Sequence, residues 1–162
     1  MAPPRGWLLG NLFARNFISS LFAEGGTGKT ALRYAQLLSL ATGNSLIGEH
    51  VFQRCRVLIV SLEDDANELR RRILAAMLRH GIDRSELRGW LFLAAPGAAA
   101  GKLMQLDNRG RIQRGALADA LESVVVNRRI DIVRSRQRRA RSRRQRRQGR
   151  RPPGLHVDNH EC

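Results

Sequence analysis

The chain has 162 residues and a formal net charge of +15, with 29 Lys and Arg against 14 Asp and Glu. This length suffices for one domain with one hydrophobic core. Two cysteines define neither a disulfide framework nor a metal-ligand spacing. The sequence contains no apolar stretch long enough to cross a membrane and no signal-peptide pattern, so we expect a cytoplasmic location.

Residues 1–15 read as a lead-in segment that packs on the edge of the domain. After it, apolar runs alternate with segments of helical periodicity. A Gly- and Ala-rich stretch at 96–111 is expected to form a mobile loop. Strand and helix in alternation predict an α/β fold with a parallel sheet flanked by helices. The predicted strands are 17–22, 56–62, 90–95 and a fourth that begins at 130–133, and the predicted helices are 29–42, 66–80 and 113–127.

The octet Ala-Glu-Gly-Gly-Thr-Gly-Lys-Thr at 23–30 lies between the first predicted strand and the first predicted helix. It fits the phosphate-binding loop pattern, in which glycines let backbone N–H groups point at phosphate oxygens. Lys29 can reach the β- and γ-phosphates, and the Thr30 hydroxyl can ligate Mg²⁺. The sequence thus predicts an ATP and Mg²⁺ site, whose nucleotide-binding residues are Glu24, Gly25, Gly26, Thr27, Gly28, Lys29, Thr30 and Ala31.

A second candidate segment, Ser61-Leu62-Glu63-Asp64-Asp65, follows the buried strand 56–62. Ligands bind at the carboxyl ends of parallel strands, so Glu63 is expected beside the phosphates. There its carboxylate can activate the attacking water, and it is our candidate catalytic residue together with Lys29. The alternative is that Asp64 and Asp65 only cap the next helix, and we expect that role for Asp65.

Three arginines at 70–72 follow on the same predicted helix. Arg72 flanks the apolar stripe of that helix, where a guanidinium plane can stack on an adenine ring. A solvated helix face is the alternative explanation.

Together, the loop, the Ser-Leu-Glu-Asp segment and the trailing arginines resemble RecA-like ATPases of the plasmid replicative helicase type, which are RepA-like and belong to the AAA family. The resemblance covers about residues 5–133. It implies a RecA-like core, ATP with Mg²⁺, a homohexameric ring, and ATP hydrolysis coupled to single-stranded DNA translocation in DNA replication. It also implies that Glu63 is the catalytic glutamate and that Arg72 contacts adenine.

The chain departs from that family after Val133. The family continues this strand as an apolar run that ends in Asp-Pro, whereas here Arg134-Ser-Arg-Gln-Arg-Arg follows. Asp131 precedes the apolar residues and is a poor substitute for the missing metal-site aspartate. The histidine sensor and the arginine finger have no counterpart either. We therefore expect residues 1–133 to form an incomplete RecA-like domain with impaired hydrolysis.

Residues 134–162 carry 11 basic and 2 acidic residues, and all the bases are arginine. We expect this tail to be disordered, because it has too few apolar residues to form a core. It is either a genuine basic arm or the product of a frameshift or truncation, and the strong bias towards arginine favours the frameshift. The alternative functions are a non-catalytic nucleic-acid-binding protein acting through the tail and a small-molecule kinase. A kinase would need lid arginines, of which 96–111 holds only Arg109 and Arg111.

Overall fold

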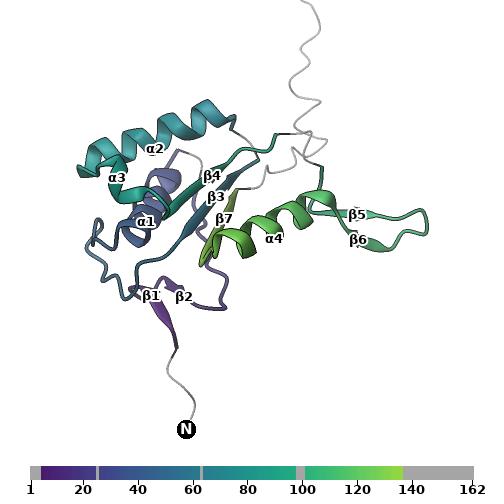
Figure 1. The fold of residues 1–162 in the computed structure, drawn as a ribbon, viewed down its shortest axis with the longest axis horizontal. Helices are drawn as coiled ribbons and strands as arrows, with labels where there is room; N and C mark the ends of the chain where they lie inside the picture. The colour runs from purple at the N-terminus through teal and green to yellow at the C-terminus, as the bar shows by residue number, and fades with distance from the viewer. Residues whose placement is uncertain (1–4, 25, 63, 98–100, 137–162) are drawn as a thin grey trace, which may run out of the picture.

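The computed structural model describes residues 5–24, 26–62, 64–97 and 101–136 of the chain. Within these residues, helices and strands alternate along the chain from α1 onwards, after a short N-terminal hairpin (Figure 1). The elements are β1 (Trp7–Leu9), β2 (Phe13–Ala14), α1 (Lys29–Thr42), β3 (Val57–Ser61), α2 (Ala66–His80), α3 (Arg84–Leu87), β4 (Leu91–Ala94), β5 (Met104–Leu106), β6 (Ile112–Arg114), α4 (Ala116–Arg128) and β7 (Ile132–Arg136).

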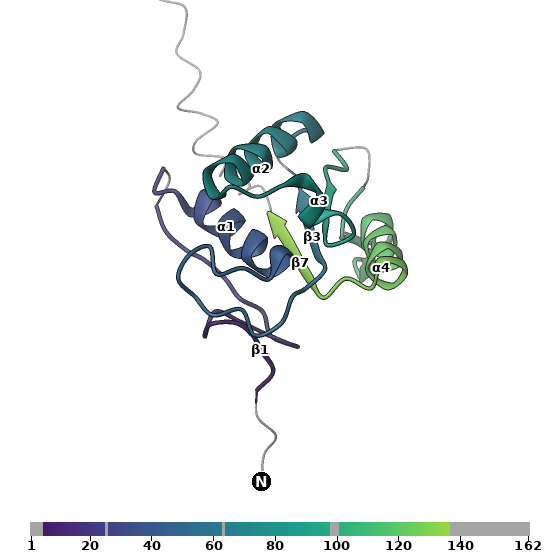
Figure 2. The ribbon, with the colours of Figure 1, turned by 60° about the vertical axis from the view of Figure 1, so that its left-hand side comes forward.

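Three strands form a parallel sheet in the order β4–β3–β7. Val57 of β3 is paired with Leu91 of β4 and with Ile132 of β7. All five residues of β3 are buried, which explains why this strand is continuously apolar. Helices α1 and α4 lie on opposite sides of the sheet (Figure 2). The predicted α/β class, with a parallel sheet flanked by helices, is confirmed.

Helices α1 and α2 begin and end where the sequence predicts. A glycine follows each of them, Gly43 after α1 and Gly81 after α2, and donates its N–H to carbonyl groups of the last turn. The centre of α1 is buried from Tyr34 to Ala41, and it packs against β3 and α2. Of the predicted apolar stripe on α2, Leu69, Ile73 and Met77 are buried, whereas its fourth member, Ala76, is only partly buried.

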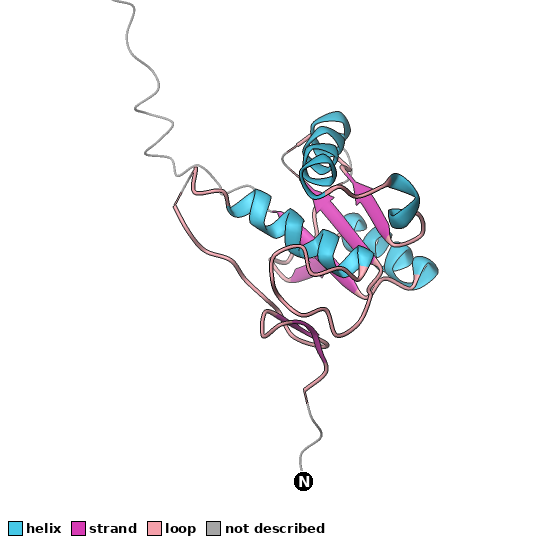
Figure 3. Ribbon diagram, turned by 90° about the vertical axis from the view of Figure 1, so that its left-hand side faces the viewer, coloured by secondary structure: helices cyan, strands magenta, loops and turns pink. Residues whose placement is uncertain are grey.

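Helix α1 runs antiparallel to the strands of the sheet. Near its C-terminus, the carbonyl oxygen of Leu40 accepts from the Cys55 N–H at 2.9 Å, just before β3 begins. The carbonyl oxygen of Ala41 accepts from Nε of Arg54 at 2.8 Å. The C-terminal end of α1 therefore lies at the amino end of β3, and its first turn points towards the carboxyl ends of the strands (Figure 3).

The lead-in segment packs on the domain edge, as predicted. It forms an antiparallel pair of β1 with β2, and Leu8 and Leu9 are 2% and 0% exposed. Leu9 also bridges to Val51, which ties the segment to the connection between α1 and β3.

The predicted strand at 17–22 is wrong, because these residues form an irregular segment between β2 and α1. Phe17, Ile18 and Phe22 are 61%, 97% and 85% exposed. Asn16, two residues after β2, turns the chain with a φ of +64°, and the segment then runs outside the sheet to α1 (Figure 3). Strand propensity expresses how well a residue packs on a pleated surface. Among the described residues, no strand pairs with 17–22, so their propensity alone does not make them a strand.

Replacing Ile18 tests this arrangement. Ile18→Lys is expected to change the free energy of unfolding by less than about 0.5 kcal/mol, because an exposed side chain loses no packing. Ile59→Ala, at a fully buried position of β3, is the matched control, with an expected loss of about 2–5 kcal/mol. Both are measured by urea unfolding. A loss of similar size for Ile18→Lys would mean that 17–22 is packed in solution.

The region 96–114 also differs from the prediction. Instead of a plain loop it contains a hairpin, in which β5 pairs antiparallel with β6, and it projects from the body of the domain (Figure 1). Helix α4 consequently begins at Ala116 rather than at 113. Of its predicted inward residues only Leu117 is buried, whereas Ala120 is exposed, Leu121 is partly exposed and Val124 is 38% exposed.

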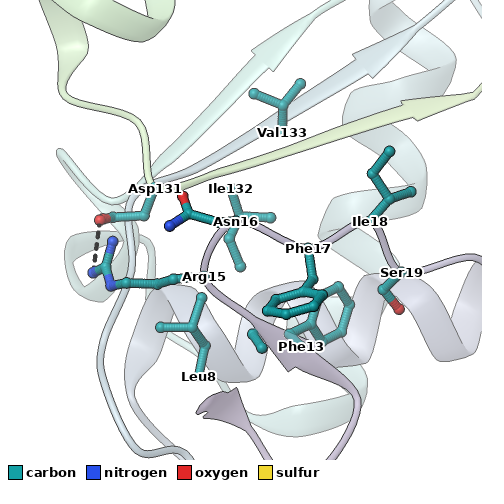
Figure 4. Close-up of a pocket in the computed structure, with 11 residues that line it drawn as sticks. Leu8, Phe13, Arg15, Asn16, Phe17, Ile18, Ser19, Asp131, Ile132 and Val133 are labelled. Atoms are coloured by element: carbon teal, nitrogen blue, oxygen red, sulfur yellow. Dashed lines mark hydrogen bonds and ion pairs between the residues drawn. The ribbon is translucent and has the colours of Figure 1, made fainter. Parts of the chain in front are cut away.

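A cavity of about 210 Å³ lies between the segment 13–19 and the first residues of β7 (Figure 4). Across its mouth, Arg15 forms an ion pair with Asp131 at 3.2 Å. None of the lining residues belongs to the loop 23–30. This cavity is therefore distinct from the predicted phosphate site.

Candidate functional site

The loop 23–30 leads directly into α1. Gly26 and Gly28 have φ values of +81° and +78°, a left-handed conformation that side chains rarely adopt. A Cβ atom on either glycine would meet nothing within 4 Å. Glycine is thus needed here for backbone conformation and not for lack of space. Gly25 lies outside the described residues.

Lys29, the first residue of α1, directs its ammonium group into this loop. The Nζ atom donates to the carbonyl oxygens of Ala23 and Glu24 and lies 3.3 Å from Oγ1 of Thr27. Oγ1 of Thr27 itself donates to the Glu24 carbonyl oxygen at 2.9 Å. The positive charge of Lys29 therefore lies against the carbonyl oxygens of an exposed loop, at the position that the motif assigns to phosphate.

The first turn of α1 has no side-chain cap among the described residues. Gly28 is the N-cap, and the turn contains no acidic residue. The first N–H groups of a helix lack intrahelical partners and carry partial positive charge, so they bind anions well. Thr30 and Ala31, both predicted to contact nucleotide, lie in this turn.

The second candidate segment begins where β3 ends. The hydroxyl of Ser61, which is fully buried, accepts from the backbone N–H of Asp64 at 3.1 Å and donates to Oδ2 of Asp64 at 3.2 Å. This turn brings the segment to the carboxyl end of the sheet, the edge towards which α1 points its first turn. Glu63, which the sequence places between Leu62 and Asp64, lies outside the described residues, so its catalytic role stays a prediction.

Arg72 is held by carboxylates of its own segment. Its Nε donates to Oε1 of Glu68 at 2.7 Å, and its Nη1 lies 3.4 Å from Oδ2 of Asp64. The hydrogen bond to Glu68, with the charge of Asp64, raises the pKa of Arg72. The Arg72 side chain is 36% exposed, and these two contacts orient its guanidinium. Contact with adenine remains a prediction for this residue.

Asp65 caps α2, as predicted. Its Oδ1 accepts from the N–H groups of Asn67 at 2.8 Å and Glu68 at 2.9 Å. These bonds favour the charged carboxylate and lower the pKa of Asp65.

The pKa of Asp65 is lower in the folded protein than in the unfolded chain. The cap therefore stabilises α2 fully at pH values above about 3.9, the unfolded pKa of an aspartate. This stabilisation is lost as the pH falls through the folded pKa. Asp65→Ala is expected to lower Tm by several degrees at neutral pH, with the gap closing in acid. Asp65→Asn keeps a capping oxygen and serves as control. Thermal unfolding followed by circular dichroism measures both, and a gap for Asp65→Ala that does not change with pH would contradict this account.

The described residues offer little for a magnesium ion. The Thr30 hydroxyl is suitably placed in the first turn of α1. Asp131, however, lies before β7 at the amino end of the sheet, where it accepts from the Arg56 N–H at 2.9 Å and pairs with Arg15. Asp64 is engaged by Ser61 and Arg72. No group of three or more His, Cys, Asp or Glu in the described part of the chain could hold a metal ion. The donor set found there does not fit a complete Mg²⁺ site.

Sequence reasoning missed a contact between the buried face of α1 and β7. Tyr34 is 2% exposed, and its hydroxyl has no hydrogen-bond partner in the described part of the chain. Cζ of Arg134 on β7 lies 5.2 Å from the centre of the Tyr34 ring. The alternation of side chains along a strand, which puts Ile132 and Arg134 on one face, is the sequence signal that could have pointed to Arg134.

No described helix is long and apolar enough to cross a membrane. Neither the curated proteins nor the solved structures include a match to this chain. A family model described as an AAA domain matches residues 2–134, which is most of the chain. That match spans the loop 23–30, the covering helices and the parallel sheet except the last two residues of β7. The chain therefore belongs to the AAA-domain family of RecA-like, nucleotide-binding ATPases.

Proposed function

We propose that this chain binds ATP through the loop 23–30 and the first turn of α1. The ammonium of Lys29 carries the proposal, since it contacts the carbonyl oxygens of a glycine loop at an uncapped helix N-terminus. Phosphate oxygens can accept from the same ammonium and from the backbone N–H groups of that turn. The AAA-domain match supports a nucleotide as the ligand.

The proposal extends to the RecA-like replicative helicases that the sequence resembles. In that scheme Glu63 orients the attacking water, Arg72 contacts adenine, and hydrolysis in a homohexamer drives movement along single-stranded DNA. In this proposal Thr30 is the protein ligand for Mg²⁺, and a metal held by so few protein groups would be bound loosely. We therefore propose an ATP-binding core, residues 1–133, whose hydrolysis is impaired.

Non-catalytic binding of nucleic acid is the second candidate. The observation that favours it is the composition of residues 134–162, with 11 basic against 2 acidic residues. Arginine-rich segments bind phosphate backbones irrespective of sequence.

A fluorescent ATP analogue, titrated against purified protein, tests the ATP proposal. Lys29→Ala is expected to weaken binding by about tenfold or more, which corresponds to about 1.4 kcal/mol or more. The chain has one other lysine, Lys102, whose side chain is exposed. Lys102→Ala removes the same charge away from the loop and should bind like the unmodified protein. Equal affinity of all three proteins would refute the proposed site.

A further inference from the structure

We propose that the N-terminal hairpin and the segment that follows it bind single-stranded DNA, with one base seated in the cavity lined by Phe13 and Phe17 (Figure 4). None of the residues involved belongs to the loop 23–30, so this surface is separate from the proposed ATP site. It lies in the folded part of the chain and is also separate from the arginine-rich residues that follow β7.

Aromatic rings and guanidinium groups lie together on this surface. Cζ of Arg5 is 5.2 Å from the centre of the Trp7 ring and 4.7 Å from the centre of the Phe17 ring. Cζ of Arg33, on α1, is 5.0 Å from the centre of the Phe13 ring. Arginine planes and aromatic rings are the groups on which proteins stack the bases of single strands.

The charge of these arginines is not balanced within the described part of the chain. No carboxylate there forms an ion pair with Arg5 or Arg33, whereas Arg15 is paired with Asp131. Burial lowers the pKa of Arg33, and the nearby charge of Arg134 lowers it further. A phosphate backbone supplies counter-charge to such a surface irrespective of its sequence.

Apolar side chains on the same surface are open to solvent. Phe17 is 61% exposed although Arg5 lies against its ring, and Ile18 and Phe22 are 97% and 85% exposed. Exposed apolar groups beside unbalanced cations fit a ligand that is both anionic and flat. A single strand of DNA meets both conditions, because the faces of its bases are free to stack, whereas in a duplex neighbouring base pairs cover them.

The cavity has the size and lining for one base. Its volume is about 210 Å³, below the roughly 300–1,000 Å³ of pockets that hold drug-sized ligands. Phe13, Phe17 and Ile132 contribute apolar walls, and Asn16 and Ser19 add polar side chains that can hydrogen-bond the edge of a base. A single planar ring is therefore the kind of group that this cavity admits.

A second copy of the chain is a poorer occupant of this surface. The chain has a formal net charge of +15, and two copies meeting here would bring their arginines together, which costs energy through like-charge repulsion. An acidic polypeptide shares the charge of DNA but has no bases to stack on the rings. The test separates these two partners.

The test measures binding of labelled oligomers of about eight nucleotides to the full chain by fluorescence anisotropy. At about 200 mM salt, the ionic contacts of the arginine-rich residues are strongly weakened. One oligomer is oligothymidylate, and the other has the same backbone without bases. The unmodified protein should bind oligothymidylate at least about tenfold more tightly. Phe17→Leu should lower that affinity by about fivefold or more and leave binding of the abasic oligomer unchanged.

Matched variants control for the ring and for the charge. Phe92 also lies under an arginine, with Cζ of Arg128 at 5.8 Å, but it belongs to β4 at the opposite edge of the sheet. Phe92→Leu should therefore bind both oligomers like the unmodified protein. Arg33→Gln should weaken both oligomers alike, because a phosphate contact does not depend on bases. Arg79→Gln, at an exposed position in the last turn of α2, should weaken neither.

Equal affinity of the unmodified protein for the two oligomers would overturn the inference. The same holds if Phe17→Leu, shown by circular dichroism to be folded, behaves like Phe92→Leu. Labelled polyglutamate of equal length that binds as tightly as oligothymidylate would also overturn it and would assign the surface to an acidic polypeptide.

Lys29→Ala distinguishes these failures from failure of the ATP site. This variant should lose affinity for the fluorescent ATP analogue and keep its affinity for oligothymidylate. If it loses both, the oligomer enters the phosphate loop, so the inference fails while the ATP proposal stands. If it loses neither, the ATP proposal fails while the DNA surface stands.

Discussion

ATP turnover by the purified chain is expected to fall far below about one per second, the lower end of typical enzyme turnover. Phosphoryl transfer depends on a well-placed metal and on positive charge supplied in the transition state. Here the described part of the site offers Thr30 as metal ligand, and Asp131 lies at the far end of the sheet. Where arginine fingers act, they contribute about 10³–10⁵ to the rate, and we expect no such contribution here. Release of phosphate, measured over hours at saturating ATP, checks this expectation.

Glu63→Gln is the decisive companion variant, because it removes the proposed base and changes little else. If hydrolysis is already impaired by loss of metal and charge, the variant and the unmodified protein should show the same residual rate. A turnover near one per second that Glu63→Gln abolishes would contradict the prediction. It would mean that a working carboxylate site forms despite the arginines of β7.

The parts of the fold that the sequence predicted correctly are those specified by local signals. Helix α2 has a capping aspartate at one end and Gly81 at the other, and its buried side chains follow a helical period. Helix α1 begins directly after Gly28 and is followed by Gly43. Where caps and hydrophobic period agree, the boundaries follow from a few neighbouring residues.

The wrong predictions concern features that depend on distant partners. A strand at 17–22 requires a neighbouring edge, and its propensity alone does not provide one. The burial of α4 depends on what covers its side of the sheet, and only Leu117 is buried there. The hairpin of β5 and β6 lies in a stretch whose glycines and alanines suggested a loop.

Only the local part of the candidate site could be predicted, because the rest depends on contacts with distant segments. The loop motif identified Lys29, whose ammonium lies within the loop, but the motif contains nothing about β7. A run of arginines reads as the end of a strand, because arginine is rarely buried. Pairing with β3 nevertheless continues to Arg136, and the ring of Tyr34 provides a surface for Arg134. Cation–π contact of this kind makes an arginine tolerable under a helix.

Binding of single-stranded DNA by the full chain is expected to be insensitive to sequence and steeply dependent on salt. Eleven arginines lie between residues 134 and 151. Proteins that contact six to ten phosphates lose about 10³–10⁵ in affinity between 50 and 200 mM salt, because neutralised phosphates release counterions. Fluorescence anisotropy with two unrelated oligonucleotides, at those two salt concentrations, measures both properties.

The matched comparison is a chain that ends at Arg136 rather than at Val133. Residues 134–136 pair with β3, so the later cut keeps the sheet intact while it removes nine of the eleven arginines. Loss of binding in this shortened protein would place the contacts in residues 137–162, in agreement with binding through the arginine-rich tail. If the shortened protein binds DNA as tightly and with the same dependence on salt, the contacts lie in the folded core. That outcome would contradict tail-driven binding and favour the helicase-like interpretation, because a RecA-like core moves on DNA through its own surface.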